Sequence, residues 1–154
     1  KIGDALNATR AAVEEGIIPG GGAALVKAVR VLDEKLHALG GEDKAGYEIV
    51  RKALVAPMTV MAQNAGLDNP ERLVEEVMES ASSHGYDFSG LVSRKLEMVD
   101  MFAAGIIDPL KVARLALENA ASIAGTLLTT EAVIVELPEE KKESPGGGMG
   151  GMDY

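Results

Sequence analysis

The pattern that decides the fold class lies between Asp108 and Leu128, where the sequence is DPLKVARLALENAASIAGTLL. Asp108 is of a type that caps helices, and Pro109 suits a first helical turn. The charged residues that follow share one narrow stripe of the helix: Lys111, Arg114 and Glu118. The stretch therefore predicts a helix from about Pro109 to Leu128, with most of its circumference covered by other elements.

Apolar residues recur at helical spacing through most of the chain before this stretch. They predict further helices at about residues 2–15, 22–37, 43–65 and 70–80. Gly16 suits the left-handed position that follows a helix. Pro57 predicts a kink or a boundary near Ala56, because proline cannot donate the helical hydrogen bond.

Strand patterns are few and short. Residues 86–88 and 97–101 are expected to form the arms of a small hairpin. Residues 132–137 (AVIVEL) form a β-branched run that favours a strand. Its backbone groups need a partner, which we expect to lie outside this polypeptide. The predicted fold class is mainly α, a helical bundle with a small hairpin and a C-terminal strand.

Composition narrows the function classes. The chain has 154 residues and a net charge of −9. Because surfaces that bind nucleic acid are normally basic, we expect no nucleic-acid partner. Hydrophobic residues make up 47% of the chain and aromatic residues 3%, which predicts an aliphatic core. Cysteine is absent and the two histidines are isolated, so we expect no metal site built on these residues. No apolar run is long enough for a membrane span, and we expect no membrane partner.

Several motifs occur in a fixed order along the chain. They are DALNATRAAVEEG at 4–16, PGGG at 19–22, GIIDP at 105–109, AASIA at 120–124, TTE at 129–131 and a Gly-Gly-Met tail. Together they resemble the group I chaperonins, the 60 kDa chaperonins of the GroEL type. Because the chain begins at Lys1 within a helix, it is expected to be a C-terminal fragment or a processed product.

The resemblance implies a division of the chain into three parts. Residues 1–15 match the end of the intermediate domain, and residues 16–137 match the C-terminal half of the equatorial, ATP-binding domain. Residues 138–154 form a Gly/Met-rich tail whose composition predicts disorder. The apical domain and the N-terminal equatorial half are missing from this match.

The family implies an ATP-driven chaperonin that assists the folding of other proteins inside a double ring of identical subunits. Its last strand joins a sheet with the neighbouring subunit, which fits the unpartnered run at 132–137. Co-chaperonin and unfolded polypeptides would bind through the absent apical domain. A cytoplasmic location is expected, with the mitochondrial matrix or plastid stroma as the alternative.

The resemblance also assigns the candidate site residues. Asp4 matches the catalytic aspartate that orients or deprotonates the water attacking the γ-phosphate. Gly21 is placed at the nucleotide, and Asp108 at the ribose hydroxyls. The residues that match the adenine-contacting segment are Asp87, Phe88 and Ser89. ATP and Mg²⁺ are the implied cofactors, with the Mg²⁺ and phosphate ligands coming mostly from the missing half.

Pattern alone gives these residues plainer roles. Asp4 would be a solvated carboxylate near a helix start, the glycine run a hinge, and Asp108 a helix cap. Asp87-Phe88-Ser89 departs from the family's common Asn-Ala-Ala, and Phe88 could stack on a base or pack in the core.

Two other functions stay open at this point. One is a non-enzymatic helical oligomerisation module, and the weaker one is a bundle that binds peptides in methionine-rich grooves. The chaperonin interpretation requires Asp4, Gly21 and Asp108 to surround one small molecule. The fragment by itself is expected to be inactive as an ATPase.

Overall fold

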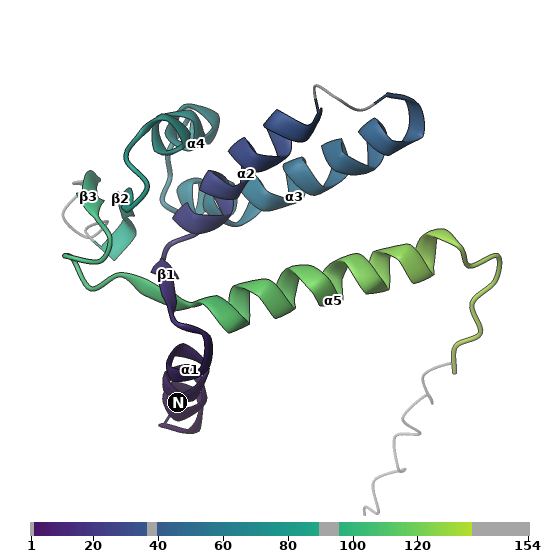
Figure 1. Ribbon diagram of the computed structural model, residues 1–154, viewed down its shortest axis with the longest axis horizontal. Coiled ribbons are helices and arrows are strands. Elements are labelled where there is room, and N and C mark those ends of the chain that lie inside the picture. Colours follow the sequence, from purple (N-terminus) through teal and green to yellow (C-terminus); the bar gives the residue numbers. More distant parts are fainter. Residues whose placement is uncertain (1, 37–39, 90–95, 137–154) are drawn as a thin grey trace, which may run out of the picture.

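The computed structural model describes residues 2–36, 40–89 and 96–136 and is mainly helical, which confirms the predicted fold class (Figure 1). Its helices are α1 (Ile2–Glu15), α2 (Ala23–Leu36), α3 (Gly41–Asn64), α4 (Pro70–Glu79) and α5 (Leu110–Leu128). Its strands are β1 (Ile17–Pro19), β2 (His84–Asp87), β3 (Glu97–Asp100) and β4 (Ile107–Pro109). The predicted tail at 138–154 lies outside the described residues.

The strands form two antiparallel pairs. In the predicted hairpin, which is confirmed, β2 pairs with β3 so that His84 faces Asp100 and Asp87 faces Glu97. The other pair was not predicted: β1 pairs with β4, and Ile18 lies opposite Asp108. Three residues are too few for a strand pattern to show in the sequence, so only the tertiary pairing reveals β1 and β4.

The hydrophobic core lies where α2, α3 and α4 meet the hairpin. Its fully buried members are Ala23, Val26, Met58, Ala62, Val77 and Met101. Unbranched methionines fill the irregular spaces between these elements, because their side chains adapt to the gaps that branched residues leave. The prediction of an aliphatic core is confirmed for this region.

Lys27 ties α2 to the C-terminal end of α4. Its ammonium nitrogen lies 2.6 Å from the carbonyl oxygen of Val77 and 2.8 Å from that of Ser80. A cation at this end of a helix satisfies carbonyl groups that have no partner within the helix. Partial burial lowers the pKa of Lys27, since it disfavours the charged form. The contact makes α4 a fixed part of the core.

Helix α5 lies apart from the core pair α2 and α3 (Figure 1). None of its residues is buried, so the prediction that most of its circumference is covered is wrong for the described chain. Ile123 is 62% exposed and Leu128 82% exposed. The helix instead contacts α1 and β4, and its charged stripe forms ion pairs with the end of α1.

The charged stripe of α5 meets two adjacent carboxylates. Lys111 pairs with Glu14, and the guanidinium of Arg114 lies 2.6 Å from the carboxylate of Glu15. Arg114 also contacts Glu118 at 2.9 Å, one helical turn further along α5. These contacts lower the pKa of Glu15, chiefly through the hydrogen bond from Arg114. They join the end of α1 to the first half of α5.

The structure corrects two local predictions. Asp108 does not cap α5: it lies in β4, the cap position falls on Pro109, and no side chain caps the helix. Helix α3 continues through Pro57, so no boundary falls near Ala56, and Leu54, Met58 and Ala62 are buried on both sides of the proline. Residues 132–136 pair with no described segment of this chain, so the strand expected there, with its partner outside this polypeptide, stays a prediction.

Within the described ranges, no helix has both the length and the apolar character needed to cross a bilayer.

We predict opposite effects for two Gly→Ala substitutions. A Cβ on Gly85 would lie 2.8 Å from the Cβ of Ala23 and 3.0 Å from the sulfur of Met101, so Gly85→Ala should lower the unfolding free energy by about 1–3 kcal/mol. Gly46 lies inside α3 with no atom near its Cβ position, so Gly46→Ala should raise it by about 1 kcal/mol. Urea denaturation followed by circular dichroism measures both, and equal effects would contradict this packing.

Candidate functional site

The glycine run that follows β1 is held against the segment that precedes β4. The amide nitrogen of Gly20 donates to the carbonyl oxygen of Ile106 at 2.9 Å. A Cβ on Gly20 would lie 3.0 Å from the carbonyl carbon of Ile106, so a larger residue would push the two backbones apart. This contact extends the β1–β4 pairing by one step and fixes the distance between the glycine run and Asp108.

Gly21 lies between this pairing and the hairpin. Its φ of +60° is in the left-handed region, which glycine adopts without a steric penalty. Its Cβ position is 3.3 Å from the terminal methyl of Met101 and 3.7 Å from the backbone oxygen of Tyr86. Helix α2 begins two residues later, at Ala23. The run lies at the N-terminus of α2, an end of a helix that suits an anionic group, and its Cβ positions face Ile106, Met101 and Met58.

The hairpin residues after Tyr86 form a tight local turn. One carboxylate oxygen of Asp87 accepts hydrogen bonds from the amide of Ser89 at 2.8 Å and from its hydroxyl at 2.6 Å. These two bonds lower the pKa of Asp87, because both favour the ionised form. Phe88 is half-buried and packs against the core cluster, which is one of the two roles the sequence left open.

Asp108 borders a small cavity between α1 and the β1–β4 pair. The cavity has a volume of about 280 Å³, and α1 contributes Ala8, Thr9 and Ala12 to its wall. Desolvation by neighbouring atoms raises the pKa of the Asp108 carboxyl above its ordinary value, although the residue keeps exposed surface. A carboxylate beside an apolar wall is suited to accept hydrogen bonds from ligand hydroxyls.

Asp4 is exposed on α1, one helical turn before Ala8. Residues four apart share one face of a helix, so Asp4 lies on the same side of α1 as a residue of the cavity wall. The structure therefore packs Gly21 against the hairpin, joins Gly20 to the segment that leads into the strand of Asp108, and places Asp4 one turn beyond the cavity that Asp108 borders. No described contact joins Asp4 to the other three.

The wall residues of α1 were not singled out from the sequence. Ala8 and Ala12 are four residues apart, so they share one face of the predicted helix at 2–15. Only the position of β4 beside α1 shows that it borders a cavity.

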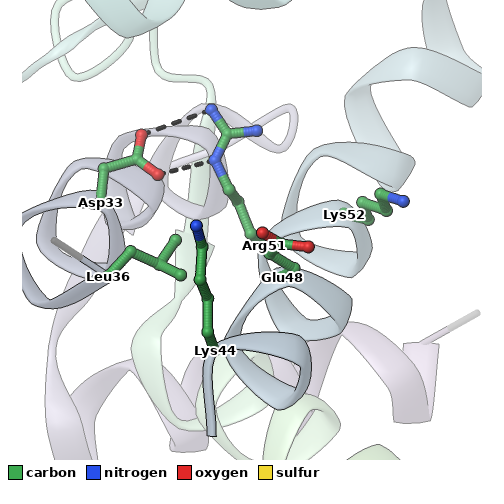
Figure 2. Close-up of a pocket in the computed structure, with 6 residues that line it drawn as sticks. All are labelled: Asp33, Leu36, Lys44, Glu48, Arg51 and Lys52. Carbon is green, nitrogen blue, oxygen red and sulfur yellow. Dashed lines mark hydrogen bonds and ion pairs between the residues drawn. The ribbon is translucent and has the colours of Figure 1, made fainter. Parts of the chain in front are cut away.

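A second cavity of about 450 Å³ lies between α2 and α3, and it is lined by charged side chains (Figure 2). Two hydrogen bonds of 2.6 and 3.3 Å join Arg51 to Asp33 across it. They raise the pKa of Arg51, and Lys44 points toward this pair. No candidate residue from the sequence lines this cavity, and its charges largely balance one another.

The described residues hold no group of three carboxylates, histidines or cysteines that could bind a metal ion. A Mg²⁺ ion prefers octahedral oxygen ligands and usually keeps waters and substrate phosphates among them. Asp4 by itself could supply one carboxylate to such an ion. The remaining ligands would have to come from phosphates, water or other polypeptide.

Comparison with known proteins identifies the family of this chain. Residues 1–138 match the model of the TCP-1/cpn60 chaperonin family. The chain belongs to this family. Over its whole length it is 49% identical to the mitochondrial chaperonin CPN60-2 of Cucurbita maxima, of which it covers 26%. The predicted resemblance to the 60 kDa chaperonins is thereby confirmed.

Solved chaperonin structures share the fold. A group III chaperonin in its open state superposes with a TM-score of 0.69 at 32% identity, covering 80% of this chain and 25% of that one. An open-state monomer of a group II chaperonin from Methanococcoides burtonii gives 0.65 at 24% identity, over 74% and 28%. The second supports the fold alone. The chain spans about a quarter of the length of the relatives it matches.

We predict that Asp87 and Asp108 titrate on opposite sides of the ordinary aspartate pKa. Hydrogen bonds lower the pKa of Asp87, so its contribution to stability is present above the unfolded pKa and is lost as the pH falls. Desolvation raises the pKa of Asp108, so its contribution favours folding at low pH and is lost as the pH rises through its folded pKa. Carbon-detected NMR of the side-chain carboxyls measures both, and the reverse order would contradict the site geometry.

Proposed function

We propose that this chaperonin segment forms one side of an ATP site whose other side comes from further polypeptide. The observation that carries the proposal is the position of Gly21, whose bare backbone lies between the hairpin and the strand pair that holds Asp108. Three segments far apart in the sequence meet there, and each carries a residue that the family resemblance assigns to nucleotide.

Each candidate residue has a distinct role in the proposed site. Gly21 lets the nucleotide approach the start of α2, and the Asp108 carboxylate accepts hydrogen bonds from the ribose hydroxyls. The turn at Asp87, Phe88 and Ser89 lies against the base. Asp4, on α1, orients or deprotonates the water that attacks the γ-phosphate. When bound, Mg²⁺ would neutralise developing phosphate charge, with Asp4 as one ligand or as a neighbour of its waters.

The proposed machine is a double ring of identical subunits that hydrolyses ATP while it assists protein folding. In it, residues 1–15 end the intermediate domain and residues 16–137 belong to the equatorial domain. The exposed run at 132–136, where Ile134 is 99% exposed, supports a strand added to a neighbouring subunit. Co-chaperonin and unfolded polypeptides would bind elsewhere in the complete protein. The proposed location is the cytoplasm, with the mitochondrial matrix or plastid stroma as the alternative. The mitochondrial alternative is supported by the similar Cucurbita maxima protein, which is mitochondrial.

One observation favours the second candidate, a helical oligomerisation module without enzymatic activity. Helix α5 has no buried residue, and a long apolar helix exposed in this way normally packs against another chain or segment. The two candidates differ in what nucleotide does. The module would assemble equally well with and without ATP.

We predict that Asp4→Ala in the complete chaperonin lowers the ATP turnover rate by about 10²–10⁴-fold and leaves ATP affinity nearly unchanged. The matched control is Asp43→Ala, which removes another exposed carboxylate from the first turn of a helix. Steady-state phosphate release and equilibrium nucleotide binding measure the two effects. Unchanged turnover in Asp4→Ala would remove this residue from the mechanism.

We predict that the 154-residue chain by itself binds Mg-ATP at least about tenfold more weakly than the complete chaperonin, because most phosphate ligands are absent from it. Isothermal titration calorimetry on both proteins makes the comparison. Equal affinities would mean that this segment holds the whole site.

A further inference from the structure

A chain of polar contacts runs from the start of α4 to the hairpin strand β2. The Tyr86 hydroxyl donates a hydrogen bond to the carboxylate of Glu76. The other oxygen of Glu76 accepts from the guanidinium of Arg72 at 2.8 Å, one helical turn away on α4. Asn69 in turn accepts from the Arg72 amide at 3.2 Å and caps the helix.

The protonation states that this chain needs persist across the physiological pH range. Hydrogen bonds from Tyr86 and Arg72 lower the pKa of Glu76, so the acceptor stays ionised. Desolvation, followed by the bond to Glu76, raises the pKa of Tyr86 to about 12, so the donor keeps its proton. A hydrogen bond to an ionised acceptor is stronger than one between neutral groups.

Helix α4 is a rigid support for this contact. One face of it is buried, with Pro70, Leu73, Val74 and Val77 in the core, and Lys27 holds its C-terminal end. A two-stranded hairpin is only marginally stable without such support. At the other end of β2, the Ser83 hydroxyl donates to Asp100 at 2.6 Å and closes the pair. Tyr86 therefore anchors the end of β2 that leads into the turn at 87–89.

Tyr86 is adjacent to both parts of the proposed nucleotide surface. Its backbone oxygen lies 3.7 Å from the Cβ position of Gly21, and the next residue, Asp87, starts the proposed base-contacting turn. A shift of the Tyr86 ring would move this turn relative to the glycine run. The sequence gives little sign of the link, because Glu76 fits the acidic pattern of an ordinary solvated helix face.

We propose that Glu76 is a positioning residue for the nucleotide base, acting through Tyr86 to hold the 87–89 turn at a fixed distance from Gly21. This inference rests on the proposed ATP site. Glu76 touches no reacting atom, so its loss should weaken ATP binding and leave the chemical step intact.

The test compares four variants in the complete chaperonin. Tyr86→Phe and Glu76→Leu each break the contact and should raise the KM for ATP about three- to tenfold, with kcat within about twofold of the parent. Glu76→Gln keeps an acceptor for the Tyr86 hydroxyl and should restore most of the affinity. Tyr47→Phe is the control, because Tyr47 lies in α3 with no hydrogen bond to its hydroxyl in the described structure.

The double variant Tyr86→Phe with Glu76→Leu separates positioning from loss of folding. If the two residues act as one unit, its KM should equal that of either single variant, since the contact is broken only once. Additive losses, a fall in kcat of the same size as the rise in KM, or a KM unchanged in Tyr86→Phe would each overturn the proposal. If Tyr86→Phe leaves the KM unchanged while Asp4→Ala abolishes turnover, Glu76 is not a positioning residue but the proposed ATP site still holds. Absence of any ATP hydrolysis by the parent protein would instead remove the proposed function itself.

Discussion

The close backbone contact between the glycine run and residues 106–109 is the constraint on which the rest of the structure depends. The Gly20 amide reaches the Ile106 carbonyl at 2.9 Å, and a Cβ at this position would meet the Ile106 backbone at 3.0 Å. The contact joins the segment that follows α1 and β1 to the segment that leads into α5. It sets α1 and α5 on one side of β1 and β4 and leaves the α2–α4 core on the other (Figure 1).

The two sides of this contact differ in how much apolar surface they bury. The core side buries methionine, valine and alanine among α2, α3, α4 and the hairpin. On the other side, an apolar groove of about 420 Å³ remains between α2 and α5, and α5 buries none of its residues. Apolar surface left open at this scale costs free energy in water. The chain spans about a quarter of the length of the relatives it matches.

Charged side chains join neighbouring elements of this molecule at two places. The ion pairs of Lys111 and Arg114 with Glu14 and Glu15 hold α1 against α5. Surface ion pairs contribute little free energy each, but a bidentate guanidinium contact restricts geometry. The contact between Glu76 and Tyr86 does the same for the hairpin. Each contact joins two different elements, and hydrophobic packing, which is non-directional, restricts the relative position of two elements less than a hydrogen bond does.

The sequence by itself determined the helices, the hairpin and the family, because apolar spacing, glycine and proline positions and motif order are local properties. The pairing of short strands depends on segments far apart in the sequence. The strands β1 and β4, and the place of Asp108 in β4 instead of at a helix cap, are therefore seen only in the pairing of Ile18 with Asp108. The strand expected at 132–136 likewise depends on a partner, which no described segment of this chain supplies. Candidate residues could be named from the motifs, but the packing of the glycine run against the hairpin and residue 106, and the link from Glu76 to the hairpin, were decided by tertiary packing. Side chains far apart in the sequence share an environment only once the backbone has folded.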